Sequence, residues 1–187
     1  RVSSYCLARN LKKKSVAELT LLREAGLTMA YLGAESGDDE VLAKVSKGET
    51  FETTRDALDK LGAAGITRSV MILNGLGGQL LSARHADNSA RLANATVDLI
   101  ELGHWEARFR AGFPEWEPLD QHGLFVEMER FLSQLELTRT VFRSDHASNI
   151  LVLKGTLGAD KARLLEQVRQ AIATPEAAPL RPAWARG

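Results

Sequence analysis

Short apolar segments alternate with helical patterns through the first hundred residues of the chain. Three strand candidates, residues 2–6, 28–34 and 68–74, are each followed by a segment with helical apolar spacing. Strands that alternate with helices form βαβ units, in which the strands lie parallel in one sheet. The strands are nearly continuous apolar runs, as expected where both faces of a sheet are covered. The pattern therefore predicts an α/β fold, and 187 residues are enough for one such domain.

Residues that cap helices mark where the intervening helices begin. Ser15 and Glu18 have the spacing of a capping box, and Asp38 and Thr50 are suited to cap the next two helices. We expect these three helices to end at glycines, which readily adopt the left-handed conformation of a helix C-terminus. The three glycines are Gly26, Gly48 and Gly65.

The second half of the chain has a weaker pattern. A long helix is predicted over about residues 82–100, and we find no clean strand in residues 97–123. Residues 123–137 form an amphipathic helix by their apolar spacing, and Asp160 is expected to cap a final helix. The chain ends in a proline- and alanine-rich segment that we expect to be an extended tail, in which Trp184 could dock.

Composition excludes several classes of protein. Lysine plus arginine and aspartate plus glutamate number 24 each, so net charge gives no attraction to nucleic acid or an anionic membrane. No apolar run reaches the ~18 residues of a membrane span, and residues 1–10 lack the apolar region of a signal peptide. The one cysteine, Cys6, excludes an internal disulfide or a multi-cysteine metal site. We expect a cytoplasmic protein with no membrane partner.

Polar residues and glycines gather where the predicted strands end. Ligands bind at the carboxyl ends of the strands in α/β barrels and open α/β sheets. Glu35 could accept hydrogen bonds from ligand hydroxyls or an amine, and the glycines of residues 74–78 let a backbone approach a ligand closely. In the alternative interpretation, residues 36–38 only turn the chain into a helix and residues 74–78 are only a loop.

Three common kinds of site are absent from the sequence. Leu80 stands where a G-x-G-x-x-G dinucleotide motif needs its third glycine, and no glycine-rich loop ends in Gly-Lys-Ser/Thr. The four histidines share no metal-ligand spacing, so we expect them at the surface or at helix caps. They are His85, His104, His122 and His146.

Several motifs occur in an order and spacing that resemble a known family. They are Gly33 to Ser36, Asp38 to Leu42, Lys47-Gly48 with Thr50, and Gly75 to Gln79. Together they resemble the radical S-adenosylmethionine (radical SAM) core, in the branch of the elongator catalytic subunit and the oxygen-independent coproporphyrinogen oxidases. Residues 141–165 resemble the tail of a bacterial subgroup of radical SAM proteins. The resemblance covers Arg1 to Gly103 and Leu135 to Ala173.

The resemblance implies the C-terminal portion of a partial (β/α)6 TIM-type barrel with parallel strands, plus C-terminal helices. Residues 1–103 would supply the βα units, residues 104–173 the remainder of the core with a lid-like segment, and residues 174–187 the tail. About two βα units of the family core would precede Arg1.

The resemblance also implies an S-adenosylmethionine site. Glu35 would meet the ribose hydroxyls or the methionyl amine, and Lys47 would pair with the methionine carboxylate. Residues 74–78 would lie along the adenine or the methionine. By position alone, Lys47 is instead a last-turn cation that complements a helix dipole. The implied cofactor-binding residues are Glu35, Ser36, Lys47, Asn74, Gly75, Gly77 and Gly78.

The family's reaction also needs a 4Fe–4S cluster, held by three cysteines spaced C-x-x-x-C-x-x-C. The sequence has no such motif, and Cys6 lies on what would be the third strand. The resemblance therefore implies a chain that holds S-adenosylmethionine but does not make a radical alone.

A polar cluster near the C-terminus leaves two interpretations open. Arg143, His146 and Asn149 could close over the barrel mouth and touch a substrate, or they could form a structural turn. Two other functions also remain possible for the chain. It could be an unrelated α/β-barrel enzyme that binds a phosphate or sugar at residues 74–78, or a non-catalytic remnant or interaction module.

Overall fold

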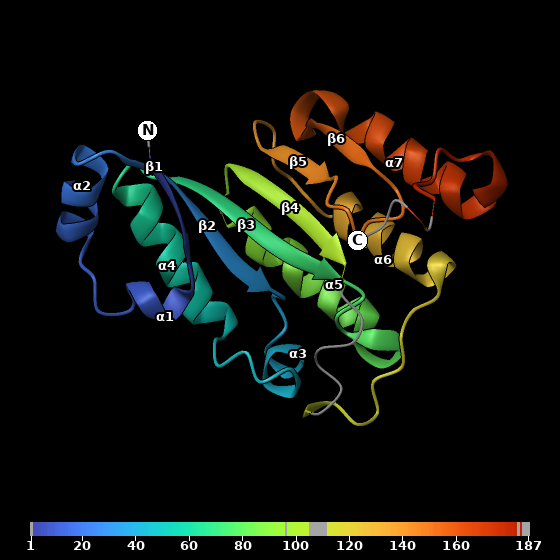
Figure 1. Ribbon diagram of the computed structural model, residues 1–187, viewed down its shortest axis with the longest axis horizontal. Helices are drawn as coiled ribbons and strands as arrows, with labels where there is room; N and C mark the ends of the chain where they lie inside the picture. Colours follow the sequence, from blue (N-terminus) through green and yellow to red (C-terminus); the bar gives the residue numbers. More distant parts are fainter. Residues whose placement is uncertain (1, 96, 105–111, 183, 185–187) are drawn as a thin grey trace.

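The computed structural model describes residues 2–95, 97–104, 112–182 and 184. Its centre is a six-stranded sheet in the order β1-β2-β3-β4-β5-β6 (Figure 1). Strands β1 to β5 pair with one another in parallel, and β6 is antiparallel to β5. The strands are β1 (Val2–Cys6), β2 (Leu27–Glu35), β3 (Thr67–Asn74), β4 (Leu99–His104), β5 (Val141–Ser144) and β6 (Leu153–Thr156). The predicted partial barrel is confirmed, and the barrel is not closed in this structure.

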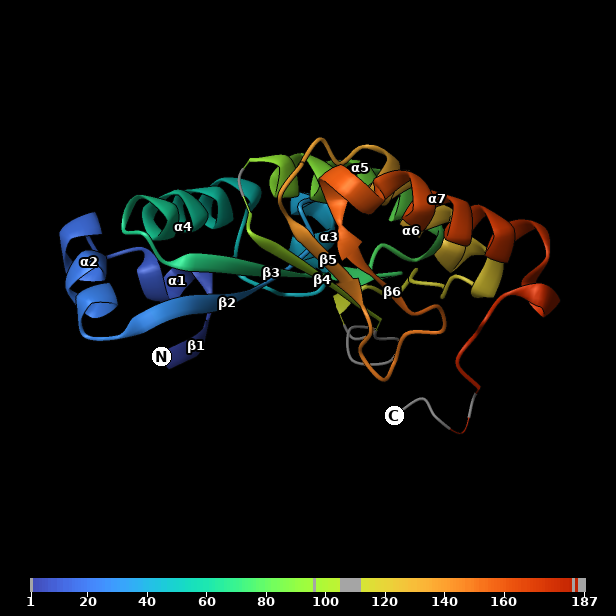
Figure 2. The same ribbon diagram turned by 90° about the horizontal axis from the view of Figure 1, so that it is seen from above.

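Helices gather on one side of the curved sheet (Figure 2). The helices are α1 (Ala8–Leu11), α2 (Val16–Glu24), α3 (Asp39–Lys44), α4 (Phe51–Ala63), α5 (Gly78–Asn94), α6 (Gln121–Ser133) and α7 (Leu157–Ala173), with the 3₁₀ turn η2 (Pro175–Ala177). Over the described residues, none of these helices is both long and apolar enough to cross a membrane.

The two faces of the sheet differ, as β2 shows. Ala30, Leu32 and Ala34 are buried against the helices, whereas Tyr31 and Glu35 lie half-buried on the opposite face. The expectation that both faces are covered is therefore wrong, because the second face lines a cavity. The apolar run in β2 is nearly continuous because its cavity face carries an aromatic ring and a glycine, and a charged side chain follows only at the end of the strand, at Glu35.

The main hydrophobic core fills the space between the sheet and the helices. Apolar side chains of β2, β3, β4 and β5 pack there against those of α4, α5, α6 and α7. A smaller core under the carboxyl ends of the strands joins α3 and α5 to residues 113–116 and includes Val41, Leu76 and Trp116. Strand β1 lies at the edge of the sheet, and its Tyr5 is 80% exposed.

The three predicted helix starts are confirmed. Ser15 and Glu18 form the expected capping box, and Thr50 accepts a hydrogen bond from the Thr53 amide. The carboxylate of Asp38 accepts hydrogen bonds from the amides of Glu40 and Val41, which start α3.

The predicted helix over residues 82–100 is wrong at both ends. Helix α5 covers Gly78–Asn94, and residues 99–104 form strand β4, so the expectation of no strand in residues 97–123 is also wrong. The apolar residues Ala93, Val97 and Ile100 fit a continued helical period, which hid the break at residue 95. Strand β4 forms because β3 and β5 lie on either side and pair with it. Residues 105–111 of this region lie outside the described residues.

Two further expectations near the C-terminus need correction. Helix α7 begins at Leu157 with Thr156 as its N-cap, so Asp160 lies inside the first turn and accepts the amide of Thr156 instead of capping the helix. Trp184 does not dock, because it is 87% exposed.

The Asp38 carboxylate stabilises the start of α3, and this role can be tested. Burial alone would raise the pKa of Asp38, but hydrogen bonds from the Val41 amide and Asn88 and the charge of Arg84 outweigh burial and lower it. We predict that Asp38→Ala lowers the free energy of unfolding by about 2 kcal/mol, because the cap and its partners lose their acceptor. Asp38→Asn should cost less, since asparagine also caps helices.

The loss of stability in Asp38→Ala should depend on pH. A carboxyl group with a lowered pKa contributes stability above its unfolded pKa of about 3.9, and this contribution disappears as pH falls through the folded value. Urea unfolding of wild type and Asp38→Ala should therefore differ fully above about pH 5 and converge in stronger acid. A difference that is the same at all pH values would contradict this role of the charge.

Candidate functional site

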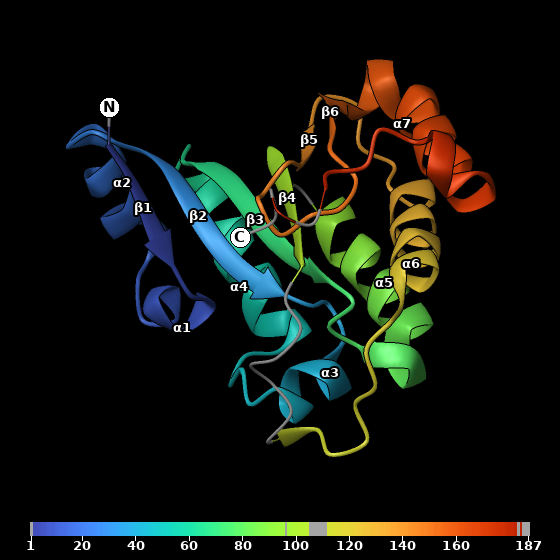
Figure 3. The same ribbon diagram turned by 45° about the vertical axis from the view of Figure 1, so that its right-hand side comes forward.

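Glu35 and Lys47 meet at the carboxyl end of β2. The Lys47 Nζ lies 2.9 Å from the Glu35 Oε1, and the two side chains are 14% and 16% exposed. Lys47 follows the C-terminus of α3, which lies just beyond the end of β2 (Figure 3). Two of the predicted cofactor-binding residues, 12 positions apart in sequence, therefore form one ion pair.

The backbone around this ion pair is specialised. Glu35 has φ of +67°, a left-handed conformation that is uncommon for a residue other than glycine. A Cβ added at Gly33 would lie 2.8 Å from Glu35 Oε1 and 3.6 Å from Lys47 Nζ. The missing side chain at Gly33 thus leaves the space into which the Glu35 carboxylate folds back over the sheet.

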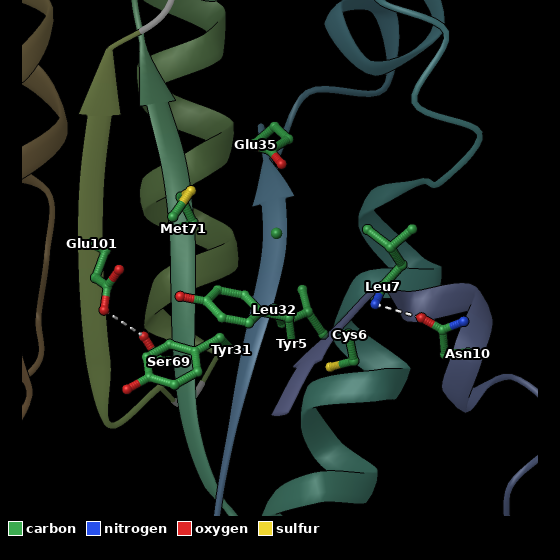
Figure 4. A pocket seen from close by; sticks show the side chains of 11 residues that line it. Tyr5, Cys6, Leu7, Asn10, Tyr31, Leu32, Glu35, Ser69, Met71 and Glu101 are labelled. Atoms are coloured by element: carbon green, nitrogen blue, oxygen red, sulfur yellow. Dashed lines mark hydrogen bonds between the residues drawn. The ribbon is translucent and has the colours of Figure 1, made fainter. Parts of the chain in front are cut away.

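A cavity of about 350 Å³ lies beside the ion pair on the open face of the sheet (Figure 4). This volume falls in the range of small-molecule sites, about 300–1,000 Å³. The cavity is lined by Tyr5, Cys6, Leu7, Asn10, Tyr31, Leu32, Gly33, Glu35, Ser69, Met71 and Glu101.

The walls of this first cavity are mostly apolar with a few polar groups. The rings of Tyr5 and Tyr31 stack with centroids 5.0 Å apart. On the neighbouring strands, the hydroxyl of Ser69, which lies opposite Tyr31 in the pairing of β2 with β3, donates to the Glu101 carboxylate at 3.3 Å. An apolar wall with two carboxylates, Glu35 and Glu101, suits a ligand that has an apolar body and a positive group.

Cys6 lies in the wall of the first cavity. Burial raises the pKa of its thiol to about 11. A thiol with this pKa stays protonated at neutral pH, so Cys6 is neither an activated nucleophile nor a ready metal ligand.

Ser36 is fully buried and faces away from the first cavity's lining. Its Oγ lies 2.8 Å from His85 Nδ1 and accepts a hydrogen bond from the Asp38 amide. The other ring nitrogen of His85 lies 3.0 Å from the Leu73 carbonyl. His85 was expected at the surface or at a cap, but it is 1% exposed within α5.

The loop of residues 74–78 packs against α6 and the segment before it. The Gly75 amide donates to the buried Glu127 carboxylate at 2.5 Å, and the Asn74 amide group donates to the Leu124 carbonyl. A Cβ added at Gly78 would lie 2.7 Å from the ring of Trp116. These contacts give the glycines a packing role, and none of residues 74–78 is among the described residues that line the first cavity.

Gly77 has a similar packing role at the start of α5. A Cβ added there would lie 2.9 Å from the Leu81 backbone and 3.0 Å from the His85 Cβ. Gly77 therefore allows α5 to begin in close contact with the loop.

A second cavity of about 420 Å³ adjoins the first. Met71 and Glu101 line both cavities. Glu101 lies opposite Arg143 in the pairing of β4 with β5, and Arg143 and His146 line the second cavity. Two of the three predicted substrate residues are therefore brought to one cavity.

The third predicted substrate residue, Asn149, has a different position. Its side chain is 3% exposed and donates to the Leu102 carbonyl at 2.5 Å. This contact joins the loop after β5 to β4. Arg181 donates to the carbonyls of Asp145 and His146, which holds the same loop from the C-terminal side.

Sequence comparison finds a similarity in the first part of the chain. Residues 10–86 match the family model described as the radical SAM superfamily. This segment is therefore similar to the radical SAM superfamily. The matched segment includes Glu35, Ser36, Lys47 and the loop of residues 74–78. A search of curated proteins finds no significant match to this chain.

Several solved structures are similar to this chain to different degrees. Elp3 of the archaeon Methanocaldococcus infernus, with an N-terminal deletion of residues 1–46, has a TM-score of 0.62 and 15% identity, over 88% of this chain and 41% of that chain. Methylornithine synthase (PylB) has a TM-score of 0.49 and 16% sequence identity, over 90% of this chain and 47% of that chain. The radical S-adenosylmethionine methyltransferase TsrM of Kitasatospora setae has a TM-score of 0.41 and 21% sequence identity, over 53% of this chain and 19% of that chain. The Elp3 match shows a shared fold, and the chain spans less than half of that protein.

The side chains fit one of the two family cofactors. The family's iron–sulfur cluster needs three thiolates, and the sequence has one cysteine, whose thiol has a raised pKa. Within the described part of the chain, no group of three histidine, cysteine or acidic residues is placed to hold a metal. S-adenosylmethionine has an ammonium, a carboxylate and an apolar body, and the charges of Glu35 and Lys47 and the apolar wall of the first cavity are of the kinds that would suit these groups.

The raised pKa of Cys6 predicts slow alkylation. At pH 8 the native thiol, with a pKa of about 11, should react roughly 100-fold more slowly with iodoacetamide than the thiol of the urea-unfolded chain. Its rate should rise as pH approaches 11. Mass spectrometry of timed samples measures both rates, and equal rates at pH 8 would contradict the burial of this thiol.

Proposed function

We propose that this chain supplies the S-adenosylmethionine-binding part of a radical SAM protein. The observation that carries the proposal is the Glu35–Lys47 ion pair, which lies beside a cavity of about 350 Å³ at the carboxyl end of β2. In the family, bound S-adenosylmethionine is the source of the radical that attacks the substrate. The residues of this chain would bind and orient that cofactor.

The ion pair matches the charges of the amino acid group of S-adenosylmethionine. Its α-ammonium would take the place of Lys47 as the partner of Glu35, and its α-carboxylate would pair with Lys47. Each of the four charges would then keep an opposite charge beside it when the ligand enters. This matters because a partly buried charge without a partner is costly.

The adenosyl part would occupy the first cavity. Tyr31 and Met71 offer apolar surface for the adenine and sugar, and Glu35 lies within reach of a ribose hydroxyl if the amine takes another position. Ser36, Asn74, Gly75, Gly77 and Gly78 would contribute by shaping the rim, because their described contacts are with other protein groups.

The second cavity is the proposed place of the substrate. It shares Met71 and Glu101 with the first cavity, so ligands in the two cavities would lie side by side. The Arg143 guanidinium has no hydrogen-bond partner in the described residues, and the Ser148 amide donates to Nδ1 of His146. A substrate with an acidic group would find donors in Arg143 and His146.

One alternative function is disfavoured by the loop of residues 74–78. A phosphate there would need free backbone amides, but the Gly75 amide already binds the Glu127 carboxylate. The Gln79 amide donates to the Glu117 carbonyl. A carboxylate at this position would also repel a phosphate.

Removing either charge of the ion pair should weaken S-adenosylmethionine binding. We predict about 10- to 100-fold weaker binding for Glu35→Gln and for Lys47→Ala, because each variant leaves a ligand charge without its partner. Isothermal titration calorimetry of the 187-residue chain measures the Kd.

Two partly exposed ion pairs provide matched controls. Lys44 is the last residue of α3, three positions before Lys47, and pairs with Glu115, and Glu129 of α6 pairs with Arg169. Lys44→Ala and Glu129→Gln should keep the wild-type affinity. Absence of binding by the wild type would favour a non-catalytic module, and equal affinity in all four variants would refute the site.

Gly33 offers a test that leaves every charge in place. A methyl group at this position meets the flexible end of Glu35 rather than backbone, so Gly33→Ala should fold with a stability within about 1 kcal/mol of wild type. It should weaken S-adenosylmethionine binding about tenfold, because the carboxylate must leave its position over the sheet. Unchanged affinity would mean that this position of Glu35 does not matter for the ligand.

A further inference from the structure

His85 connects the loops that follow β2 and β3. Its Nδ1 lies 2.8 Å from the Ser36 hydroxyl, and its Nε2 lies 3.0 Å from the Leu73 carbonyl. Ser36 is the residue directly after Glu35, and Leu73 comes just before the loop of residues 74–78. One buried side chain of α5 thus contacts both candidate motifs.

The partners of His85 define its proton positions. A carbonyl oxygen only accepts hydrogen bonds, so Nε2 must carry the proton that faces Leu73. In the neutral imidazole with this tautomer, Nδ1 accepts the Ser36 hydroxyl, and the Ser36 oxygen accepts the Asp38 amide at 2.9 Å. The groups form one chain of hydrogen bonds: Asp38 amide to Ser36, Ser36 to His85, and His85 to Leu73.

The surroundings of this chain are dry and closely packed. Ser36 is 0% exposed and His85 is 1% exposed. The Gly37 amide donates to the Ser89 hydroxyl, one turn further along α5. The Glu127 carboxylate lies 3.8 Å from the His85 Nε2 and also accepts the Gly75 amide. Helix α5 therefore holds the segment after Glu35 through side chains rather than by backbone pairing.

We infer that His85 is a positioning residue for Glu35. It holds the Ser36 hydroxyl and so fixes the residue that follows Glu35. A residue other than glycine keeps a φ of +67° only where its neighbours hold it there. Through Ser36, His85 keeps the Glu35 carboxylate turned over Gly33 toward Lys47. The effect on ligand binding rests on the proposed function, whereas the effect on the Glu35 backbone does not.

Two variants separate this role from a general contribution to folding. The side-chain oxygen of His85→Asn can occupy the place of Nδ1 and still accept the Ser36 hydroxyl. The side-chain amide of His85→Gln can occupy the place of Nε2 and still donate to Leu73. Each variant loses one buried hydrogen bond, so the two should lose similar stability. Only His85→Gln should release Ser36.

The experiment uses two measurements on the full chain. Titration with S-adenosylhomocysteine should give affinity about tenfold weaker for His85→Gln and within about twofold of wild type for His85→Asn. Nuclear magnetic resonance of labelled protein without ligand should show the Glu35 and Ser36 amide signals displaced in His85→Gln and retained in His85→Asn. Ser36→Ala, which removes one oxygen, serves as a second variant and should behave like His85→Gln.

The outcomes distinguish the two proposals. If the wild type does not bind S-adenosylhomocysteine, the proposed function fails, and the resonance measurement alone decides the role of His85. Equal displacement of the Glu35 signals in the asparagine and glutamine variants would overturn the positioning role, as would no displacement in either. If His85→Gln does not fold, retained Glu35 signals in Ser36→Ala would also overturn it.

Discussion

Parallel pairing of β1 to β5 is the constraint on which the rest of the structure depends. Because parallel strands need crossover segments, the connecting helices lie against the sheet and cover one of its faces. The same pairing brings the strand ends to one rim and sets Gly33, Met71, Glu101 and Arg143 in register across four strands. Both cavities open along this row, so their side-by-side position follows directly from the strand register.

Much of the first half of the fold could be predicted because its signals are local. Helix starts at Ser15, Asp38 and Thr50 depend on hydrogen bonds within three residues, which a sequence displays directly. Strand β4 could not be predicted in the same way. Its residues carry an apolar spacing that also fits a helix, and its pairing partners lie about 30 and 40 residues away in sequence.

The candidate site was also only partly predictable from the sequence. Glu35 and Lys47 were found from a pattern of motifs, and the structure joins them in an ion pair. Ser36 and residues 74–78 carry the same motifs, but their described contacts are with buried groups such as His85 and Glu127, which a strand-end pattern does not reveal. The sequence gives a weak indication that His85 is buried. It falls on the face of α5 that also carries Leu81, Ser89 and Leu92, all of which are buried.

The central claim is that the Glu35–Lys47 pair receives the amino acid group of S-adenosylmethionine. A crystal structure of the chain grown with S-adenosylmethionine tests this most directly. The account predicts the ligand ammonium within hydrogen-bond distance of Glu35, its carboxylate at Lys47 and its adenosyl part in the cavity beside Tyr31. A ligand bound elsewhere, or one that leaves the Glu35–Lys47 ion pair closed and untouched, would contradict it.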